Sequence, residues 1–144
     1  MEESILSKFE FENLLINEYE NWYLLLRKEQ VTLGSLVLIE KSFKTNYSDI
    51  SKESFEEFGK IVKEIESVLK NSFDYDKINY FMLMMVDNEV HYHIVPRYSK
   101  DVKFGNMIFK DFTWPGLPEL KNKNHIDSEE LNNILDFLKK EFGV

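Results

Sequence analysis

The sequence of 144 residues contains no cysteine, which excludes disulfide bonds, cysteine-ligated zinc and thiol chemistry. Arginine is scarce as well, because only Arg27 and Arg97 occur among 18 basic residues. Planar cations that can bind a phosphate or carboxylate with two hydrogen bonds are therefore few. Histidine occurs three times. Any chemistry that needs an imidazole must use one of these three residues.

Long apolar runs and basic clusters are also missing. The longest uncharged apolar run, "YFMLMMV" at 80–86, is too short to cross a bilayer, and we expect no membrane partner. The first residues are acidic where a signal peptide needs basic ones, which favours a cytoplasmic location. A net charge of −8 without a basic stripe argues against binding to nucleic acid. A small phosphorylated ligand is compatible with this charge, since a local pocket can be positive on an acidic protein.

Hydrophobic residues make up 43% of the chain, which is typical of a globular protein. Apolar periodicity predicts one α+β domain over 1–144, with about five strands in a mainly antiparallel sheet and two principal helices. In the second helix, Asp127 and Glu130 match a capping box. We expect residues 77–87 to form a central strand buried on both faces. The other expected strands are two within 9–29, one each at 33–41 and 89–98, and a shorter one within 102–112; the helices span 49–72 and 125–142.

The most unusual stretch is "EVHYHIVPR", residues 89–97, which holds two of the three histidines. Because side chains alternate along a strand, Glu89, His91, His93 and Arg97 would share one face, on which residues two positions apart are about 6–7 Å from each other. Spacing alone leaves three interpretations open. The face could be exposed to solvent and have no catalytic role. It could bind a metal through Glu89, His91 and His93, or it could take part in acid–base or nucleophilic catalysis.

This stretch resembles the signature strand of the histidine triad (HIT) superfamily, in which three histidines alternate with apolar residues and Pro-Arg often follows. The shared ending aligns His93 with the third histidine, His91 with the second and Glu89 with the first. "YLLLRKEQVTLGSLVL", residues 23–38, resembles the family's strand–turn–strand, with Gly34 matching a family glycine and Ser35 standing where the family prefers histidine. "NYFMLMMVD" and "WPGLP" are similar to a bacterial branch of HIT-like hydrolases.

The resemblance implies a hydrolase or nucleotidyl transferase that acts on a nucleotide phosphoanhydride or phosphoramidate through a nucleotidyl-histidine intermediate. His91 would be the nucleophile and His93 would assist at the phosphate, with Glu89 as a third catalytic position. An imidazole suits this role because it is a competent nucleophile near neutral pH. The resemblance also implies a homodimer and no cofactor. Substrate contacts are expected from Arg27, Ser35, Asn79 and Arg97.

The chain departs from the family pattern at Glu89 and Ser35, each of which replaces a histidine. The short "VDNEV" connection also lacks the Gly-Gln-Ser/Thr-like stretch that binds the leaving group in many members. Leaving-group recognition must therefore differ. Two alternatives to the enzyme remain open, namely a metal-binding protein and a catalytically inactive HIT-like dimer that binds nucleotide.

Overall fold

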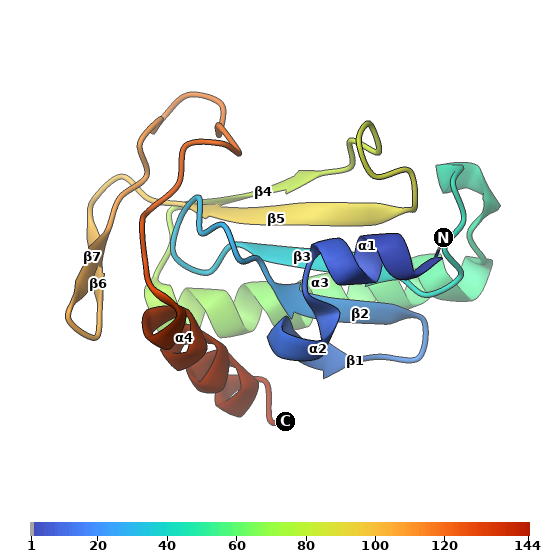
Figure 1. Cartoon of the computed structure of the whole chain (residues 1–144), viewed down its shortest axis with the longest axis horizontal. Coiled ribbons are helices and arrows are strands. Elements are labelled where there is room, and N and C mark those ends of the chain that lie inside the picture. The colour runs from blue at the N-terminus through green and yellow to red at the C-terminus, as the bar shows by residue number, and fades with distance from the viewer. Residues whose placement is uncertain (1) are drawn as a thin grey trace.

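A computed structural model describes residues 2–144, with side chains from residue 5 onward. Its centre is a five-stranded antiparallel sheet in the order β1-β2-β3-β5-β4 (Figure 1). Residues 102–109 form a separate two-stranded sheet. The strands are β1 (Leu15–Glu18), β2 (Trp22–Leu26), β3 (Leu36–Glu40), β4 (Lys77–Phe81), β5 (His91–Arg97), β6 (Val102–Phe104) and β7 (Met107–Phe109).

Helices cover the two faces of the sheet unequally (Figure 1). The long helices α3 (Lys52–Phe73) and α4 (Ser128–Glu141) contribute to the large core, together with residues of β2, β3 and β5. The short helices α1 (Glu2–Lys8) and α2 (Phe11–Leu14) precede β1. Ile5 of α1 and Phe9 form a second, smaller core with Leu25, Val37 and Ile39. The sheet is therefore buried on both faces, and α1 with its neighbouring residues covers part of the face opposite α3.

Strand β5 lies between β3 and β4, and its register decides which side chains meet. His93 pairs with Val37 and with Phe81, and His91 pairs with Ile39. Since Val37 and Ile39 belong to the smaller core, both histidines lie on the face that α1 covers. The alternate residues of β5, such as Tyr92 and Ile94, enter the large core, as the sequence predicts.

A side-chain cap begins each of the two long helices. Ser51 caps α3 by accepting a hydrogen bond from the backbone N–H of Ser54. Asp127 and Glu130 form the predicted capping box at the start of α4. The buried positions of α4 are apolar, namely Leu131, Ile134, Leu135 and Leu138. None of the helices in the described part of the chain is long and apolar enough to cross a membrane.

Several predicted boundaries are wrong for identifiable reasons. Residues 11–14 form helix α2, whereas the sequence predicts a strand throughout this region. The strand predicted over 77–87 ends at Phe81 and lies at the edge of the sheet. The strand predicted within 102–112 is a hairpin that turns at Gly105, whose φ of 59° suits glycine. These errors concern short elements or apolar runs, in which periodicity is ambiguous.

Strand β5 continues through Pro96 and ends at Arg97. The ladder with β3 stops at Ile94, so no β3 partner needs an N–H from residue 96. The carbonyl of Pro96 accepts a hydrogen bond of 2.5 Å from the Thr32 hydroxyl. Glu89 lies in a bend before the strand, which begins at His91.

Candidate functional site

His91 and His93 line a pocket of about 270 Å³ on the face of the sheet that α1 covers. Three segments close this pocket around the first half of β5. Lys8 and Phe9 come from the end of α1, residues 83–87 come from the β4–β5 connection, and Leu120 and Lys121 come from the loop before α4. Arg27, which directly follows β2, completes the lining. The pocket therefore collects residues that are far apart in the sequence.

The imidazole of His91 has a defined orientation. Its Nδ1 atom lies 2.7 Å from the backbone carbonyl oxygen of Glu89. A carbonyl oxygen can only accept, so Nδ1 carries the proton and donates it. In the neutral ring, Nε2 then holds a lone pair. This hydrogen bond holds the side chain in the tautomer that a nucleophilic Nε2 requires. The residue is buried, with only 2% of its surface exposed.

His93 is held neutral beside it. The two imidazole rings lie 4.9 Å apart, edge to face. Burial, reinforced by the neighbouring His91 and Arg27, lowers the pKa of His93 to about 3. Its Nδ1 atom is buried and has no hydrogen-bond partner within the described residues. A buried imidazole nitrogen without a partner is costly, and a bound ligand could satisfy it.

Phe9 covers both histidines. Its ring centroid lies 5.8 Å from that of His91 and 5.9 Å from that of His93. Phe9 directly precedes Glu10, whose backbone adopts the left-handed conformation between α1 and α2 with φ of 55°. Lys8 on the same segment pairs with Asp87 of the β4–β5 connection at 2.6 Å. The end of α1 is thus both the cover of the histidine pair and one wall of the pocket.

Cations outnumber anions in this pocket, in contrast to the acidic protein as a whole. Lys8, Arg27 and Lys121 line it, and Asp87 is the acidic lining residue, which Lys8 neutralises. Arg27 donates from Nη1 to the carbonyl of Glu29, but its Nε atom is buried without a partner among the described residues. An anionic group is the natural ligand for such a guanidinium.

Glu89 does not line this pocket through its side chain. The described side chains include none that makes a hydrogen bond or ion pair with the Glu89 carboxylate, and the bend at residue 89 removes it from the strand alternation that the sequence predicts. Its contribution to the site is the backbone carbonyl that orients His91. The predicted row of polar side chains on one strand face therefore begins at His91.

Ser35, predicted to contact substrate, is fully buried in the turn before β3. Its hydroxyl donates to the carbonyl of Thr32 at 2.9 Å and accepts from the N–H of Thr32 at 3.1 Å. Ser35 thus stabilises the turn and is not part of the pocket lining. Gly34 beside it has φ of 88° and lies against Phe73 and Pro96, so a side chain there would be strained and crowded.

Arg97 and Asn79, also predicted to contact substrate, lie elsewhere. Arg97 is four residues beyond His93, about 13 Å along the strand. It is buried, binds Asp111 through two hydrogen bonds of 2.7 and 3.1 Å, and donates to Asn79 at 2.9 Å. This network ties the loop after β7 to β4 and β5. Arg97 and Asn79 therefore do not line the pocket of the histidine pair but a separate cavity, which Trp114 also lines.

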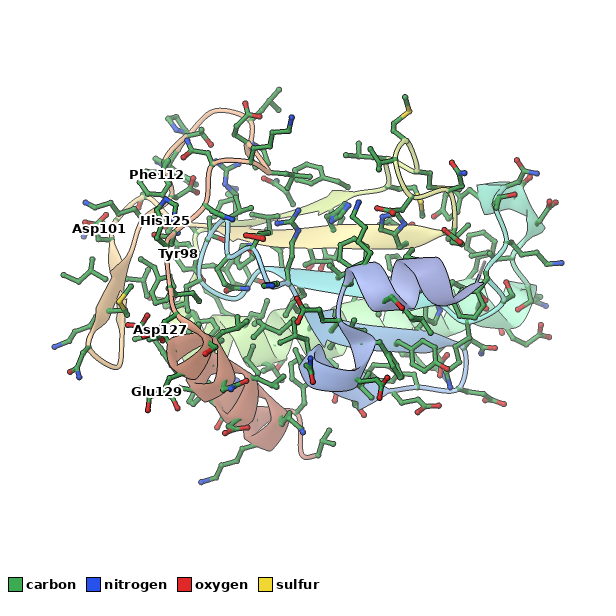
Figure 2. The ribbon with its side chains drawn as sticks, in the orientation of Figure 1. Tyr98, Asp101, Phe112, His125, Asp127 and Glu129 are labelled. Carbon is green, nitrogen blue, oxygen red and sulfur yellow. The ribbon has the colours of Figure 1, made fainter. Side chains whose placement is uncertain are left out.

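The third histidine, His125, is also remote from this pocket. Figure 2 shows it in the segment before α4, on the same side of the view as Tyr98 and Asp127. It lines a different, polar cavity.

Within residues 2–144, the structure contains no cluster of three or more His, Asp or Glu side chains placed to hold a metal ion. The ligand set Glu89, His91 and His93 is therefore not assembled in this arrangement.

The sequence analysis did not predict nine of the residues that line this pocket, and these include Lys8, Phe9, Asp87 and Lys121. Ile5 and Phe9 are four residues apart, a spacing that places them on one helix face and that could have signalled a short amphipathic helix. Lys121 lies in a Pro-rich loop, and no local pattern indicates its position.

The fold and the sequence can be compared with known proteins. A family model described as the HIT domain matches residues 8–100. No curated protein matches the chain. Among solved structures, a histidine triad protein from Bradyrhizobium japonicum is 17% identical, with a TM-score of 0.72 and 94% of this chain and 95% of that chain covered.

Two further structures are similar. A hypothetical histidine triad nucleotide-binding protein from Sulfolobus tokodaii is 20% identical with a TM-score of 0.69, covering 96% of this chain and 89% of that one. A zinc-bound histidine triad family protein from Mycobacterium smegmatis is 17% identical with a TM-score of 0.64, covering 99% and 98%. The domain match includes the strand that carries His91 and His93. The chain therefore belongs to the HIT family.

Proposed function

We propose that the protein is a cytoplasmic hydrolase or nucleotidyl transferase that acts on a nucleotide phosphoanhydride or phosphoramidate. The observation that carries the proposal is the bond from His91 Nδ1 to the Glu89 carbonyl, which leaves Nε2 as the free nucleophilic atom. The pocket in front of it is cationic, as a phosphate-binding site should be. The family fold is compatible with this chemistry.

The reaction proceeds in two steps. In the first, Nε2 of His91 attacks the phosphorus atom attached to the nucleoside, and the bond from phosphorus to the leaving group breaks. The leaving group takes the bonding electron pair and, where its basicity requires, a proton. In the second step water or another acceptor attacks the same phosphorus, which releases the nucleotide and restores the imidazole.

Two other residues stabilise the phosphate during these steps. His93 stays neutral at physiological pH because burial lowers its pKa, so it offers one ring N–H to a phosphate oxygen without adding charge. Arg27 offers a guanidinium whose buried Nε lacks a partner within the described residues. Both groups are preorganised for the charge that develops on phosphorus oxygens in an in-line displacement.

The test is turnover of a panel of adenosine and guanosine conjugates by wild type, His91→Ala and Arg27→Gln. The proposal expects loss of turnover in His91→Ala and a large rise in KM or fall in kcat in Arg27→Gln. Lys28→Gln is the matched control, because Lys28 lies next to Arg27 in the chain but pairs with Glu10 outside the pocket. Equal turnover by wild type and His91→Ala would refute the role of His91.

One observation favours a second candidate, a nucleotide-binding protein without turnover. Phe9 covers His91, and the histidine is almost fully buried. Calorimetry that shows nucleotide binding, together with an absence of product across the panel, would select this candidate.

We also propose that the chain forms a homodimer. Strand β4 is at the edge of the sheet, and an edge strand offers unpaired backbone groups to a second chain. Sedimentation equilibrium tests this directly, and a monomer at micromolar concentration would contradict it.

A further inference from the structure

The carbonyl that orients His91 belongs to a peptide unit that is also held on its opposite side. The C=O of Glu89 and the N–H of Val90 lie in one planar peptide unit and point in opposite directions. The Val90 N–H donates a hydrogen bond of 2.9 Å to the backbone carbonyl of Lys44, and the Val90 carbonyl accepts one of 3.1 Å from the N–H of Glu40. The direction of the Glu89 carbonyl therefore depends on the position of Lys44.

Lys44 lies in the connection between β3 and α3, at the end of the sheet where β5 begins (Figure 1). Phe43, directly before it, adopts the left-handed conformation with φ of 57°, which residues with a side chain rarely adopt. The Phe43 side chain packs against the smaller core that includes Phe9. Because local backbone preference does not favour this turn, other contacts must hold it.

Those contacts include the carboxylate of Glu40, the last residue of β3. Its Oε1 atom accepts a hydrogen bond of 2.9 Å from the backbone N–H of Ser42 and another from the Ser42 hydroxyl. Its Oε2 atom accepts one of 2.5 Å from the hydroxyl of Ser54, in the first turn of α3. Glu40 is only 2% exposed and Ser54 is fully buried. A buried carboxylate is costly unless it is hydrogen-bonded, so these bonds hold Glu40 and the turn together.

We propose that Glu40 is a positioning residue for His91. Its carboxylate holds the turn that leads to Lys44, whose carbonyl holds the Val90 N–H. The same peptide unit presents the Glu89 carbonyl to Nδ1 of His91. Glu40 does not line the pocket, so it acts through the tautomer of the imidazole and not by contact with substrate. Its effect on turnover rests on the proposed function, whereas its effect on the tautomer does not.

The experiment compares Glu40→Met with Asp76→Leu by NMR of the 15N-labelled imidazole nitrogens at about pH 8, where an ordinary imidazole is neutral. Methionine is of similar length but is a poor hydrogen-bond acceptor, so the turn loses its support. We expect His91 to be a single Nδ1–H tautomer in wild type and a mixture with the Nε2–H tautomer in Glu40→Met. Asp76 is the matched control, because its carboxylate also accepts from the N–H and the hydroxyl of one serine, Ser99, beyond the other end of β5. Asp76→Leu should keep the single tautomer.

Two further variants separate positioning from a loss of folding. Ser42→Ala removes one donor of the network at an exposed position, so it should fold and show a smaller share of the Nε2–H tautomer. On a substrate that wild type turns over, Glu40→Met should lower kcat by about tenfold and leave KM nearly unchanged, since the imidazole is misaligned while the pocket is intact. Glu40→Gln, which can still accept from Ser42, should keep kcat near the wild-type value.

The outcomes are distinguishable. A single Nδ1–H tautomer in both Glu40→Met and Ser42→Ala overturns the proposal, whatever the stability of the two variants. An equal mixture in Asp76→Leu also overturns it, because any loosening at the ends of β5 would then suffice. A mixture confined to Glu40→Met and Ser42→Ala supports it. The same NMR result without turnover by wild type supports the positioning role and refutes the proposed function alone.

Discussion

The Nδ1 atom of His91 donates a hydrogen bond of 2.7 Å to the backbone carbonyl oxygen of Glu89. Glu89, which the sequence resemblance aligns with the family's first histidine, thus contributes through its main chain. A backbone carbonyl is present whatever side chain stands at position 89. The orientation of the proposed nucleophile is therefore compatible with a glutamate there.

We predict that Glu89→Ala changes kcat/KM by no more than about threefold, since the carboxylate does not line the pocket and the carbonyl remains. Glu89→His should likewise give no gain on dinucleoside polyphosphates. Steady-state kinetics of the two variants checks both statements. A 100-fold loss in Glu89→Ala, or a large gain in Glu89→His, would show that the side chain takes part in the reaction.

Phe9 should control access to the histidines, because its ring covers both imidazoles. We expect Phe9→Ala to increase the rate at which diethyl pyrocarbonate modifies His91 by several-fold, measured by peptide mass spectrometry. Phe11→Ala is the matched control. The ring centroid of Phe11 lies 4.8 Å from that of Tyr23, and Phe11 does not line this pocket. Equal modification rates in wild type and Phe9→Ala would mean that the cover opens freely in solution.

His93 should make stability depend on pH. Its pKa is lowered to about 3 by burial, whereas an unfolded histidine titrates near 6.5. Between these values the unfolded chain binds more protons than the folded chain. The free energy of unfolding therefore falls as pH decreases from about 6.5 towards 3, by at most about 1.4 kcal/mol per pH unit from this one group. His93→Gln should show a shallower dependence in denaturant titrations, and identical slopes would contradict the assignment.

The buried pair Arg97–Asp111 should be important for stability and unimportant for chemistry. Asp111→Asn leaves a buried guanidinium without its countercharge, and we expect a loss of about 3–5 kcal/mol in unfolding free energy. The exposed ion pair Lys110–Asp101 provides the comparison. Lys110→Ala should lower the free energy of unfolding by less than about 1 kcal/mol. Urea denaturation measures both. A fall in kcat of folded Asp111→Asn as large as that of Arg27→Gln would place the pair in the reaction.

Much of the fold could be predicted because its signals are local. Asp127 and Glu130 stand at capping-box spacing ahead of periodic leucines, and α4 follows. The alternation around His91 and His93 likewise predicts a strand, together with the face that each residue occupies. The family resemblance was confirmed by the domain match and by the similar structures.

The remaining features depend on contacts that local patterns do not contain. An apolar run at 80–86 looks like a buried strand, yet Met85 and Val86 lie at the rim of a pocket. Apolarity alone does not distinguish a buried strand from an exposed loop. Arg97 lies on the same strand as the histidines, but it does not line their pocket and instead binds Asp111, which is 14 residues away in the sequence. The hydroxyl of Ser35 likewise donates a hydrogen bond to the backbone carbonyl of Thr32.

The most direct test of the account is to trap the covalent intermediate. Wild type is mixed with an adenosine phosphoramidate, quenched in base within milliseconds and digested for mass spectrometry. We predict an adenylyl group on His91 that is absent in His91→Ala and unchanged in His125→Ala, because His125 lines a different cavity. Consumption of substrate without an adduct on His91, or an adduct that persists in His91→Ala, would contradict it.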